Sequence, residues 1–450
     1  MKLIYGIKDR PKFPQLIVFA IQQLLAIMAA TLVVPIIIGN GMHPTAALLG
    51  AGLGTLVYVL FTKAKSPVFL GSSFAFLSSM SAAFAGAATA SLGYLGLIVG
   101  AILAGLVYVV IALIVKFAGV NWIDKLMPKQ VIGPTVSIIG LSLAGNAIGD
   151  LQKGGYQVDN VPTANVFVAI ICGLVALFVT MVCSVYGKKM IKLIPFIIGI
   201  LSGYAVAAIF TVIGIVTENP NLMVINFGVF SDLKIFTVPE FTFLTAIKGV
   251  KDFRPEYLGM IAMAYVPVAF VVFAEHIADH KNISSIIETD LLKEPGLHRT
   301  LLGDGVGSIV GSIFGGCPNT TYGESVACVA ITGNASVFTI ITAAIMAIII
   351  AFFDPFVAFV NSIPSCVMGG ICMALYGFIA VSGLKMIQKV DLEDNKNLFT
   401  VSVILIAGIG GLVLKFGEIT ITAIATALIL GIITNIVLSL KKTDKAEENE

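Results

Sequence analysis

Charge is scarce in this chain of 450 residues. Only 12% of the residues are charged and 58% are hydrophobic, whereas a soluble domain carries about 25% charged residues. Basic and acidic residues nearly balance, and the formal net charge is +2. The composition therefore excludes an ordinary soluble domain, and it offers no basic surface for a nucleic-acid partner.

We also expect neither paired cysteines nor a cleavable secretion signal. The six cysteines lie mostly inside apolar runs and form no C-x-x-C pair, so we interpret them as small core residues and not as a disulfide or metal set. The amino terminus is polar and basic, and the first apolar run is too long for the hydrophobic region of a cleavable signal peptide.

What the chain has in abundance is long apolar runs, each able to cross about 30 Å of hydrocarbon as a helix. We predict an all-α polytopic membrane protein with fourteen transmembrane segments, embedded in a lipid bilayer. The predicted segments cover residues 15–38, 45–62, 67–86, 92–116, 130–149, 163–186, 191–216, 257–280, 299–316, 321–332, 335–353, 356–384, 398–414 and 418–440.

Lysine and arginine indicate the orientation. Alternating the segments from a cytoplasmic amino terminus puts most of these residues in loops on the inner side, as the positive-inside rule requires. Both termini are then cytoplasmic, including a tail at residues 441–450. Lys248, Lys251 and Arg254 are the exception, and we assign them to an amphipathic stretch at the membrane surface.

Two short motifs recur in the two halves of the chain. Residues 72–76 (SSFAF) match residues 320–324 (TTYGE), and the pattern P-x-x-V-x-G begins at Pro128 and again at Pro364. Because each half holds seven segments, an odd number, the two copies must run through the membrane in opposite directions. The predicted inverted repeats cover residues 1–217 and 218–440.

Segments three and ten, which carry the first motif, are short and begin with Gly, Ser, Thr and Pro. Paired interrupted segments are the best indication in a sequence of a transporter's binding site. An extended stretch followed by a half-helix leaves backbone N–H groups free, and these can bind carbonyl oxygens of a ligand with help from the helix dipole. The alternative is that these glycines serve only flexible packing.

Ionisable residues gather at the end of segment eight. Glu275 and Asp279 are four residues apart, as are His276 and His280, so each pair shares one face of a helix. A charge at membrane depth costs about 2.5–3.5 kcal/mol on insertion scales and usually marks a substrate or ion pathway. Asp279 or His276 could carry a coupling proton; for His276 the alternative is a hydrogen bond that packs helices together.

Glu275 and Glu324 both lie in apolar surroundings with no Lys or Arg nearby in the sequence. Such carboxyls are either protonated or bonded to N–H donors. Together with free backbone N–H groups, they suit a small planar solute such as uracil or another cyclic imide. Asp304 is interpreted as a scaffold partner for a neighbouring helix. No nucleophile–base pair or complete metal motif accompanies these residues, so we predict neither an enzyme nor a metal site.

Three stretches carry a family resemblance. They are AEH at residues 274–276, DLLK-x-PGLHR at 290–299 and PNTTYGE at 318–324. They are similar to the bacterial uracil permeases of the nucleobase–ascorbate transporter family, also called nucleobase:cation symporter-2. The resemblance runs over essentially the full length, from Gln22 and Gln23 to segment fourteen.

The resemblance implies a core domain of segments 1–4 and 8–11 and a gate domain of segments 5–7 and 12–14. It also implies that the base binds between short strands in segments three and ten. The two glutamates would contact the N–H groups of the base, and the backbones of Phe74 and Gly323 its carbonyls. The implied substrate-binding residues are Ser73, Phe74, Glu275, Tyr322, Gly323 and Glu324.

We therefore expect a proton-coupled uracil symporter that imports the base across the bacterial inner membrane by motion of the core against the gate. Protonation of Glu275 or Asp279 would favour loading, and Asp279 occupies a position tied to coupling in the family. No cofactor beyond the coupling proton is expected, and coupling to sodium stays open. Family analogy also implies a homodimer through the gate domain.

Three positions depart from the family signature. Ser325 stands where Asn is usual, Ala327 where Gly is usual, and Gly333 where uracil-transporting members carry Arg. These changes leave Gly323 and Glu324 intact, but they bear on helix packing and on the choice of base. A xanthine, urate or other purine carrier on the same scaffold is the alternative, and a passive channel also stays open.

Overall fold

The computed structural model describes residues 3–119, 121–158, 161–188, 190–231, 233–416 and 419–440. Within these ranges, eight helices are long and apolar enough to cross a membrane. The protein is therefore a helical membrane protein that crosses the bilayer several times. The predicted cytoplasmic tail at residues 441–450 lies outside the described residues.

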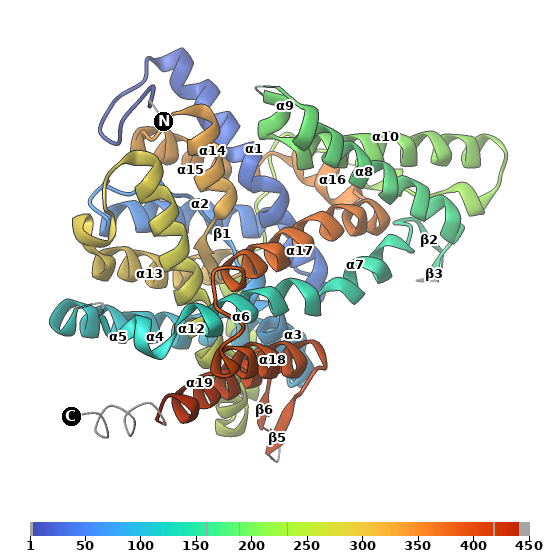
Figure 1. Cartoon of the computed structure of the whole chain (residues 1–450). Helices are drawn as coiled ribbons and strands as arrows, with labels where there is room; N and C mark the ends of the chain where they lie inside the picture. The colour runs from blue at the N-terminus through green and yellow to red at the C-terminus, as the bar shows by residue number, and fades with distance from the viewer. Residues whose placement is uncertain are drawn as a thin grey trace, which may run out of the picture.

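Helical elements occupy each predicted segment (Figure 1). In the first half they are α1 (Phe13–Ile38), α2 (Pro44–Phe61), α3 (Leu77–Ala85), α4 (Ala90–Ala118), α6 (Lys129–Ser142), α7 (Ala144–Leu151), α8 (Val166–Tyr186) and α10 (Pro195–Val216). In the second half they are α12 (Pro255–Ile287), α13 (Leu297–Gly315), α14 (Gly323–Thr332), α15 (Val337–Ala351), α16 (Asp354–Ser362), α17 (Ser365–Ile387), α18 (Asn395–Ile409) and α19 (Ala423–Leu440). Short helices α5 (Asn121–Leu126), α9 (Met190–Leu193) and α11 (Thr242–Ala246) connect them.

The observed helices differ from the predicted segments in several places, of which two are informative. Helix α12 continues past the predicted end at residue 280, because Ile283 and Ile287 are buried while Lys281 points outward. The predicted segment 356–384 is divided into α16 and α17 at Ile363 and Pro364, which both have extended backbone. Proline lacks the N–H that a continuous helix needs, and it disfavours helical geometry in the residue before it.

The chain is not wholly α-helical. Strands β1 (Leu70–Ser72) and β4 (Asn319–Thr321) pair antiparallel, with Leu70 opposite Thr321 and Ser72 opposite Asn319. The short strands expected in segments three and ten are thus present, and both are buried. Figure 1 shows β1 near the centre of the molecule. Two further antiparallel strand pairs were not predicted. In one, β2 (Gln157–Val158) pairs with β3 (Val161–Pro162), and in the other, β5 (Leu414–Phe416) pairs with β6 (Ile419–Ile421).

Each central strand leads directly into a short helix. Strand β1 is followed by the 3₁₀ turn η1 (Phe74–Phe76) and α3, and β4 is followed by α14. The first N–H groups of a helix have no partner within that helix. The paired strands therefore bring the beginnings of two helical elements to one place, as the repeated motif predicted.

The helices pack as two groups. In the first, α13 packs on α2 and α4, α15 packs on α1 and α2, and α12 packs on α4. In the second, α17 packs on α6, α7 and α8, while α18 packs on α19 and α6. Contact between α2 and α13 is close enough that a Cβ atom at Gly50 would lie 2.5 Å from the carbonyl oxygen of Gly311. Helix α12 also contacts α6, α19 and β6, so it lies where the two groups meet.

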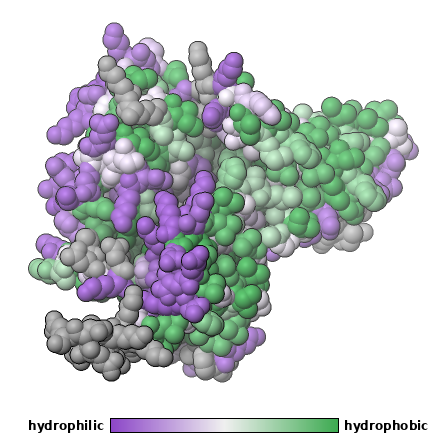
Figure 2. Space-filling model, in the orientation of Figure 1, coloured by the Kyte–Doolittle hydropathy of each residue, from purple (hydrophilic) through white to green (hydrophobic). Residues whose placement is uncertain are grey.

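Large apolar side chains stay exposed on α8 and α10. Examples are Phe167, Phe178 and Val185 on α8 and Ile209 and Val216 on α10. Figure 2 shows these helices as a mostly hydrophobic extension on the right of the molecule. A contiguous apolar surface of this kind is rare on a protein that faces water, and it suits contact with lipid.

Candidate functional site

A cavity of about 450 Å³ lies beside the paired strands. On one wall are side chains from α12, the end of β4 and the start of α14. On the other are side chains of α17 and α10, so the cavity is formed between the two helix groups. The predicted residues on the first wall are Phe74, Glu275, Asp279, Tyr322, Gly323 and Glu324.

The strand pair is held rigidly next to this cavity. The Tyr322 hydroxyl donates to the carbonyl oxygen of Ser72 at 2.6 Å, joining the end of β4 to the end of β1. A Cβ atom at Gly71 would lie 2.4 Å from the Tyr322 ring, so only glycine fits there. Tyr322 therefore lines the cavity and also fixes the geometry of the strands.

Ser73 and Phe74 were both predicted to bind substrate at the start of the first half-helix, and of these two only Phe74 lines the cavity. Its ring contacts the ring of Tyr376 on α17 edge to face, with centroids 6.0 Å apart. Ser73 is buried, and its N–H donates to the carbonyl oxygen of Pro318 at 2.9 Å. Ser73 thus supports the turn that positions Phe74 and does not itself face the cavity.

The second half-helix places a carboxyl at its own beginning. Helix α14 starts at Gly323, and Glu324 lies in its first turn. An acidic side chain at this end is stabilised by the helix dipole. Glu275 reaches the same cavity from α12, so the structure brings together two carboxyls that are distant in the sequence.

Asp279 is tied to the strand pair by a side-chain hydrogen bond. Its Oδ2 atom accepts from the Thr321 hydroxyl at 2.8 Å. Thr321 is the last residue of β4 and directly precedes Tyr322 and Gly323. Asp279 is therefore linked, through one bond, to the backbone that leads into α14.

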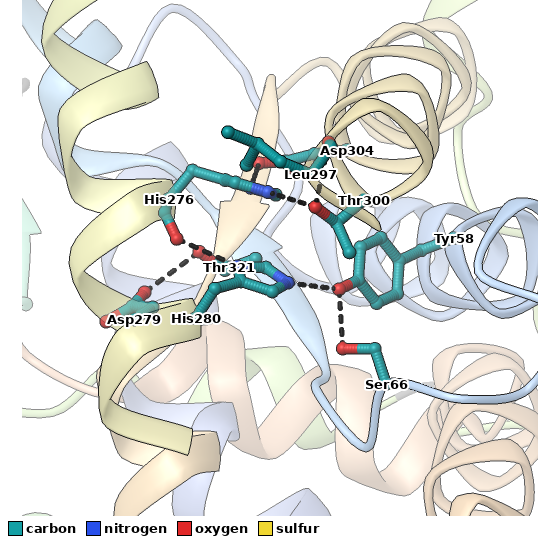
Figure 3. Close-up of polar contacts among 9 residues, drawn as sticks. All are labelled: Tyr58, Ser66, His276, Asp279, His280, Leu297, Thr300, Asp304 and Thr321. Carbon is teal, nitrogen blue, oxygen red and sulfur yellow. Dashed lines mark hydrogen bonds and ion pairs between the residues drawn. The ribbon is translucent and has the colours of Figure 1, made fainter. Parts of the chain in front are cut away.

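His276 faces away from the cavity. Its ring is fully buried, with Nδ1 2.7 Å from Oδ2 of Asp304 and Nε2 2.9 Å from the Thr300 hydroxyl, both on α13 (Figure 3). This geometry agrees with the helix-packing alternative for His276 and with the scaffold role expected for Asp304. The proton-coupling role predicted for His276 is not supported by any contact with the cavity.

A second buried network lies one helical turn further along α12. His280 Nε2 lies 2.7 Å from the Tyr58 hydroxyl, and that hydroxyl lies 2.7 Å from the Ser66 hydroxyl. The rings of His276 and His280 stack with centroids 4.0 Å apart. The four-residue spacing of the histidines predicted a shared face, but nothing in the sequence indicated Tyr58 or Ser66 as partners.

One departure from the family signature has a clear structural role. The Ser325 hydroxyl accepts from the backbone N–H of Phe69 at 2.9 Å and from the side-chain amide of Gln23. This one residue of α14 therefore connects α1 to the segment that enters β1. A buried hydroxyl here satisfies two donors that would otherwise lose their partners.

The sequence did not indicate the second wall of the cavity. Phe196 of α10 and Phe378 and Ser382 of α17 lie there, together with Ser184 of α8 and Lys192 of α9. Phe196, Phe378 and Ser382 lie in apolar runs with no local motif, and Lys192 was not distinguished from other basic residues near it. Only the packing of the two helix groups brings these side chains to the cavity.

Comparison with known proteins adds independent findings. The sequence model of a family described as a permease family matches residues 14–416. The uracil permease of Bacillus subtilis is 38% identical, over 100% of this chain and 98% of its own length. The uracil permease of Escherichia coli K12 is 34% identical, over 98% of this chain and 96% of its own length.

Solved structures share the fold at low identity. The transmembrane domain of the cyanobacterial bicarbonate transporter BicA superposes with a TM-score of 0.63 at 16% identity, covering 95% of this chain and 99% of that chain. The murine anion transporter Slc26a9 superposes with a TM-score of 0.66 at 11% identity, covering 97% of this chain and 70% of that chain. The family match over most of the chain, together with the full-length relatives, shows that this protein belongs to the nucleobase–ascorbate transporter family of permeases, which are transporters and not enzymes.

Proposed function

We propose that the protein is a proton-coupled uracil symporter. The observation that carries this proposal is the cavity beside the paired strands, where Glu275, Asp279 and Glu324 meet the start of α14. Relatives named uracil permeases align over nearly the whole chain, which supports the same substrate class here. Glu324 suits uracil because its carboxylate can accept from an N–H of the base.

The site offers uracil a complementary set of partners. Uracil carries two N–H donors and two carbonyl acceptors. In the proposed pose, Glu275 and Glu324 accept from the N–H groups, and the backbone N–H groups at Phe74 and Gly323 donate to the carbonyls. Tyr322 lies alongside the base, and Ser73 supports the turn beneath it. Each buried polar atom of the base would then have a partner, which offsets the cost of removing it from water.

Coupling of uracil binding to proton uptake follows from the negative charge of the three carboxyls in the cavity. Three ionised carboxyls in one cavity repel one another, so taking up a proton lowers the free energy of the loaded site. We assign the exchanging proton to Glu275 or Asp279, both on the cavity face of α12. Release of the base would follow when that carboxyl loses its proton to the cytoplasm.

In this proposal, the first helix group is the core domain and the second is the gate domain. A rigid shift of the first group against the second would open the cavity alternately to each side of the membrane. The cavity here extends towards Ser184, Lys192 and Met386, near loops that the positive-inside rule assigns to the cytoplasm. We therefore propose an inward-facing conformation, with both termini in the cytoplasm. The proposed location is the inner membrane, and the proposed dimer forms through the gate helices.

Uptake of radiolabelled uracil tests the proposal in cells that lack their own uracil permease. We expect uptake that is abolished by a protonophore and is unaffected by excess unlabelled xanthine. Uptake that persists with the protonophore would contradict proton coupling and favour a passive channel. Strong competition by xanthine would indicate that the substrate is a purine. Uptake measured in parallel in sodium-free buffer distinguishes proton coupling from sodium coupling.

A further inference from the structure

The contacts around His276 admit one arrangement in which every donor has an acceptor. The Thr300 hydroxyl lies 3.1 Å from the carbonyl oxygen of Leu297, to which it can donate its single hydrogen. With that bond in place, the same hydroxyl oxygen accepts from Nε2 of His276, which lies 2.9 Å away. In this arrangement Nε2 carries a proton. Figure 3 shows this chain of contacts between α12 and α13.

The other ring nitrogen requires a second proton in the contact with Asp304. Nδ1 of His276 lies 2.7 Å from Oδ2 of Asp304. Without a proton between them, the lone pair of the nitrogen would face a lone pair of the carboxylate oxygen. One proton there gives either a neutral imidazole with a protonated acid or an imidazolium with a carboxylate. In both cases the pair has no net charge.

The second oxygen of Asp304 favours the neutral form. Oδ1 is buried, and it has no hydrogen-bond partner among the described residues. An ionised carboxylate carries charge on both oxygens and normally binds donors at both. A protonated acid that donates from Oδ2 to the histidine leaves Oδ1 as a carbonyl oxygen, which costs less to bury alone.

The surroundings of the pair also disfavour a net charge. His280 donates from Nδ1 to the carbonyl oxygen of His276 at 2.8 Å, and its Nε2 lies 2.7 Å from the Tyr58 hydroxyl, a group that can donate to a neutral ring. Its ring stacks on that of His276, where two positive charges would repel each other. The ionisable groups near the pair are Glu275, Asp279 and His280 on α12, Tyr58 on α2 and Tyr108 on α4. Arg299 of α13 donates instead to the carbonyl oxygen of Phe61.

We propose that His276 and Asp304 share one proton that stays in place throughout transport. The neutral pair acts as a positioning element that joins α12 to α13 and keeps Glu275 turned towards the cavity. Proton exchange is then confined to the cavity face of α12. The part of this inference that concerns coupling rests on the proposed function, whereas the protonation of the pair does not.

Nitrogen-15 NMR of the full chain, labelled at histidine and held in lipid nanodiscs, tests the protonation directly. The chain has only four histidines. The His276 signals are assigned by their loss in His276→Gln, or by elimination with His43→Gln, His280→Gln and His298→Gln. We expect the His276 signals to be the same from pH 5.5 to 8, with and without uracil. A change of protonation state at His276 over this range, or on adding uracil, would overturn the proposal.

Transport by Asp304→Asn tests the consequence. Asparagine can donate from its amide nitrogen to Nδ1 of His276 and keeps a carbonyl oxygen in place of Oδ1, so it mimics the protonated acid permanently. We expect uracil uptake within about threefold of the parent, with the same pH profile, because a hydrogen bond between neutral groups is kept. Asp304→Ala removes the hydrogen-bond partner of His276, and we expect its uracil uptake to fall by more than tenfold.

Asp279→Asn is the matched control, with the same substitution on the cavity face. Under the proposal it alters the pH profile while Asp304→Asn does not. The inference is refuted if Asp304→Asn still exchanges uracil but loses its protonophore-sensitive accumulation. If the parent protein moves no uracil, the proposed function fails, and the NMR experiment still decides whether the pair keeps its proton.

Discussion

The two faces of α12 carry similar residues in very different surroundings. On the cavity face, Glu275 lines open space, and Asp279 accepts a hydrogen bond from the Thr321 hydroxyl. On the opposite face, both ring nitrogens of His276 and of His280 have hydrogen-bond partners on α2, α12 and α13. The four-residue spacing is the same for both pairs, so spacing alone does not determine the role.

The two faces of α12 differ in how many of their polar side-chain atoms have hydrogen-bond partners. A side chain with every polar atom bonded can exchange a proton only by breaking a buried network, which is costly. A carboxyl that faces a cavity can change its partner from a proton to a ligand at little structural cost. The cavity face of α12 is therefore suited to binding and exchange, and the buried face to holding the helix in position.

The largest effect is expected from Glu324→Ala on the cavity side. It removes a charged acceptor for an N–H group of the base, and such hydrogen bonds contribute about 1.5–3 kcal/mol, or roughly 10- to 150-fold. We expect kcat/KM for uracil uptake to fall by that factor while the protein still reaches the membrane. Ala327→Ser, at another cavity residue of α14, is the control. Near-normal kcat/KM in Glu324→Ala would remove Glu324 from the binding site.

Asp279→Asn should separate transport from coupling. The amide cannot take up a proton, so accumulation of uracil against a gradient is lost while exchange of labelled for unlabelled uracil continues. We expect steady-state accumulation to fall about tenfold in proteoliposomes with an imposed pH gradient, since a tenfold gradient corresponds to about 1.4 kcal/mol. Unchanged accumulation would instead assign the coupling proton to Glu275, which Glu275→Gln then tests.

Tyr58→Phe should affect stability more than transport. The change removes the hydroxyl that bonds to His280 Nε2 and to the Ser66 hydroxyl, so both groups lose this partner. Leaving a buried polar group unpaired costs about 1–3 kcal/mol. We expect a lower thermal unfolding temperature in detergent, with uptake per folded molecule within about twofold of the parent because the network only positions α12. Loss of coupling in this variant would show that the buried face takes part in proton exchange.

The smallest effect is expected at the surface. Lys65 Nζ lies 2.5 Å from Oε1 of Glu294, and this bond lowers the pKa of the Glu294 carboxyl. A lowered pKa stabilises the fold above the unfolded-state pKa, and the contribution disappears as the pH falls through the lowered value. Glu294→Gln should therefore reduce the unfolding temperature slightly at pH 7 and not at all in acid. A large change at neutral pH would contradict the small contribution expected of an exposed pair.

Much of the fold could be predicted from local patterns. Apolar runs located the helical segments, and the motif shared by residues 72–76 and 320–324 located the two strands and the half-helices after them. The prediction was less accurate where a helix continues beyond its apolar run, as in α12, and where two residues interrupt a run, as at Ile363 and Pro364. Helix ends depend on solvent and packing as well as on sequence.

The site residues likewise include some that the sequence could predict and some that it could not. Glu275, Asp279 and Glu324 could be selected because a carboxyl in an apolar run demands an explanation wherever it packs. Phe378 and Lys192 could not be selected, because they reach the cavity only through contact between the two helix groups. Which face of α12 binds α13 also depends on Thr300 and Asp304, and no periodicity within α12 reveals them.

The claim that proton exchange is confined to the cavity face of α12 is tested most directly by counting protons. Uracil is added to the purified protein in weakly buffered solution, and the pH change is followed with an indicator dye. The account predicts equal proton uptake by the parent and Asp304→Asn, and loss of the signal in Asp279→Asn or Glu275→Gln. A signal that is lost in Asp304→Asn and kept in both cavity-face variants would contradict it.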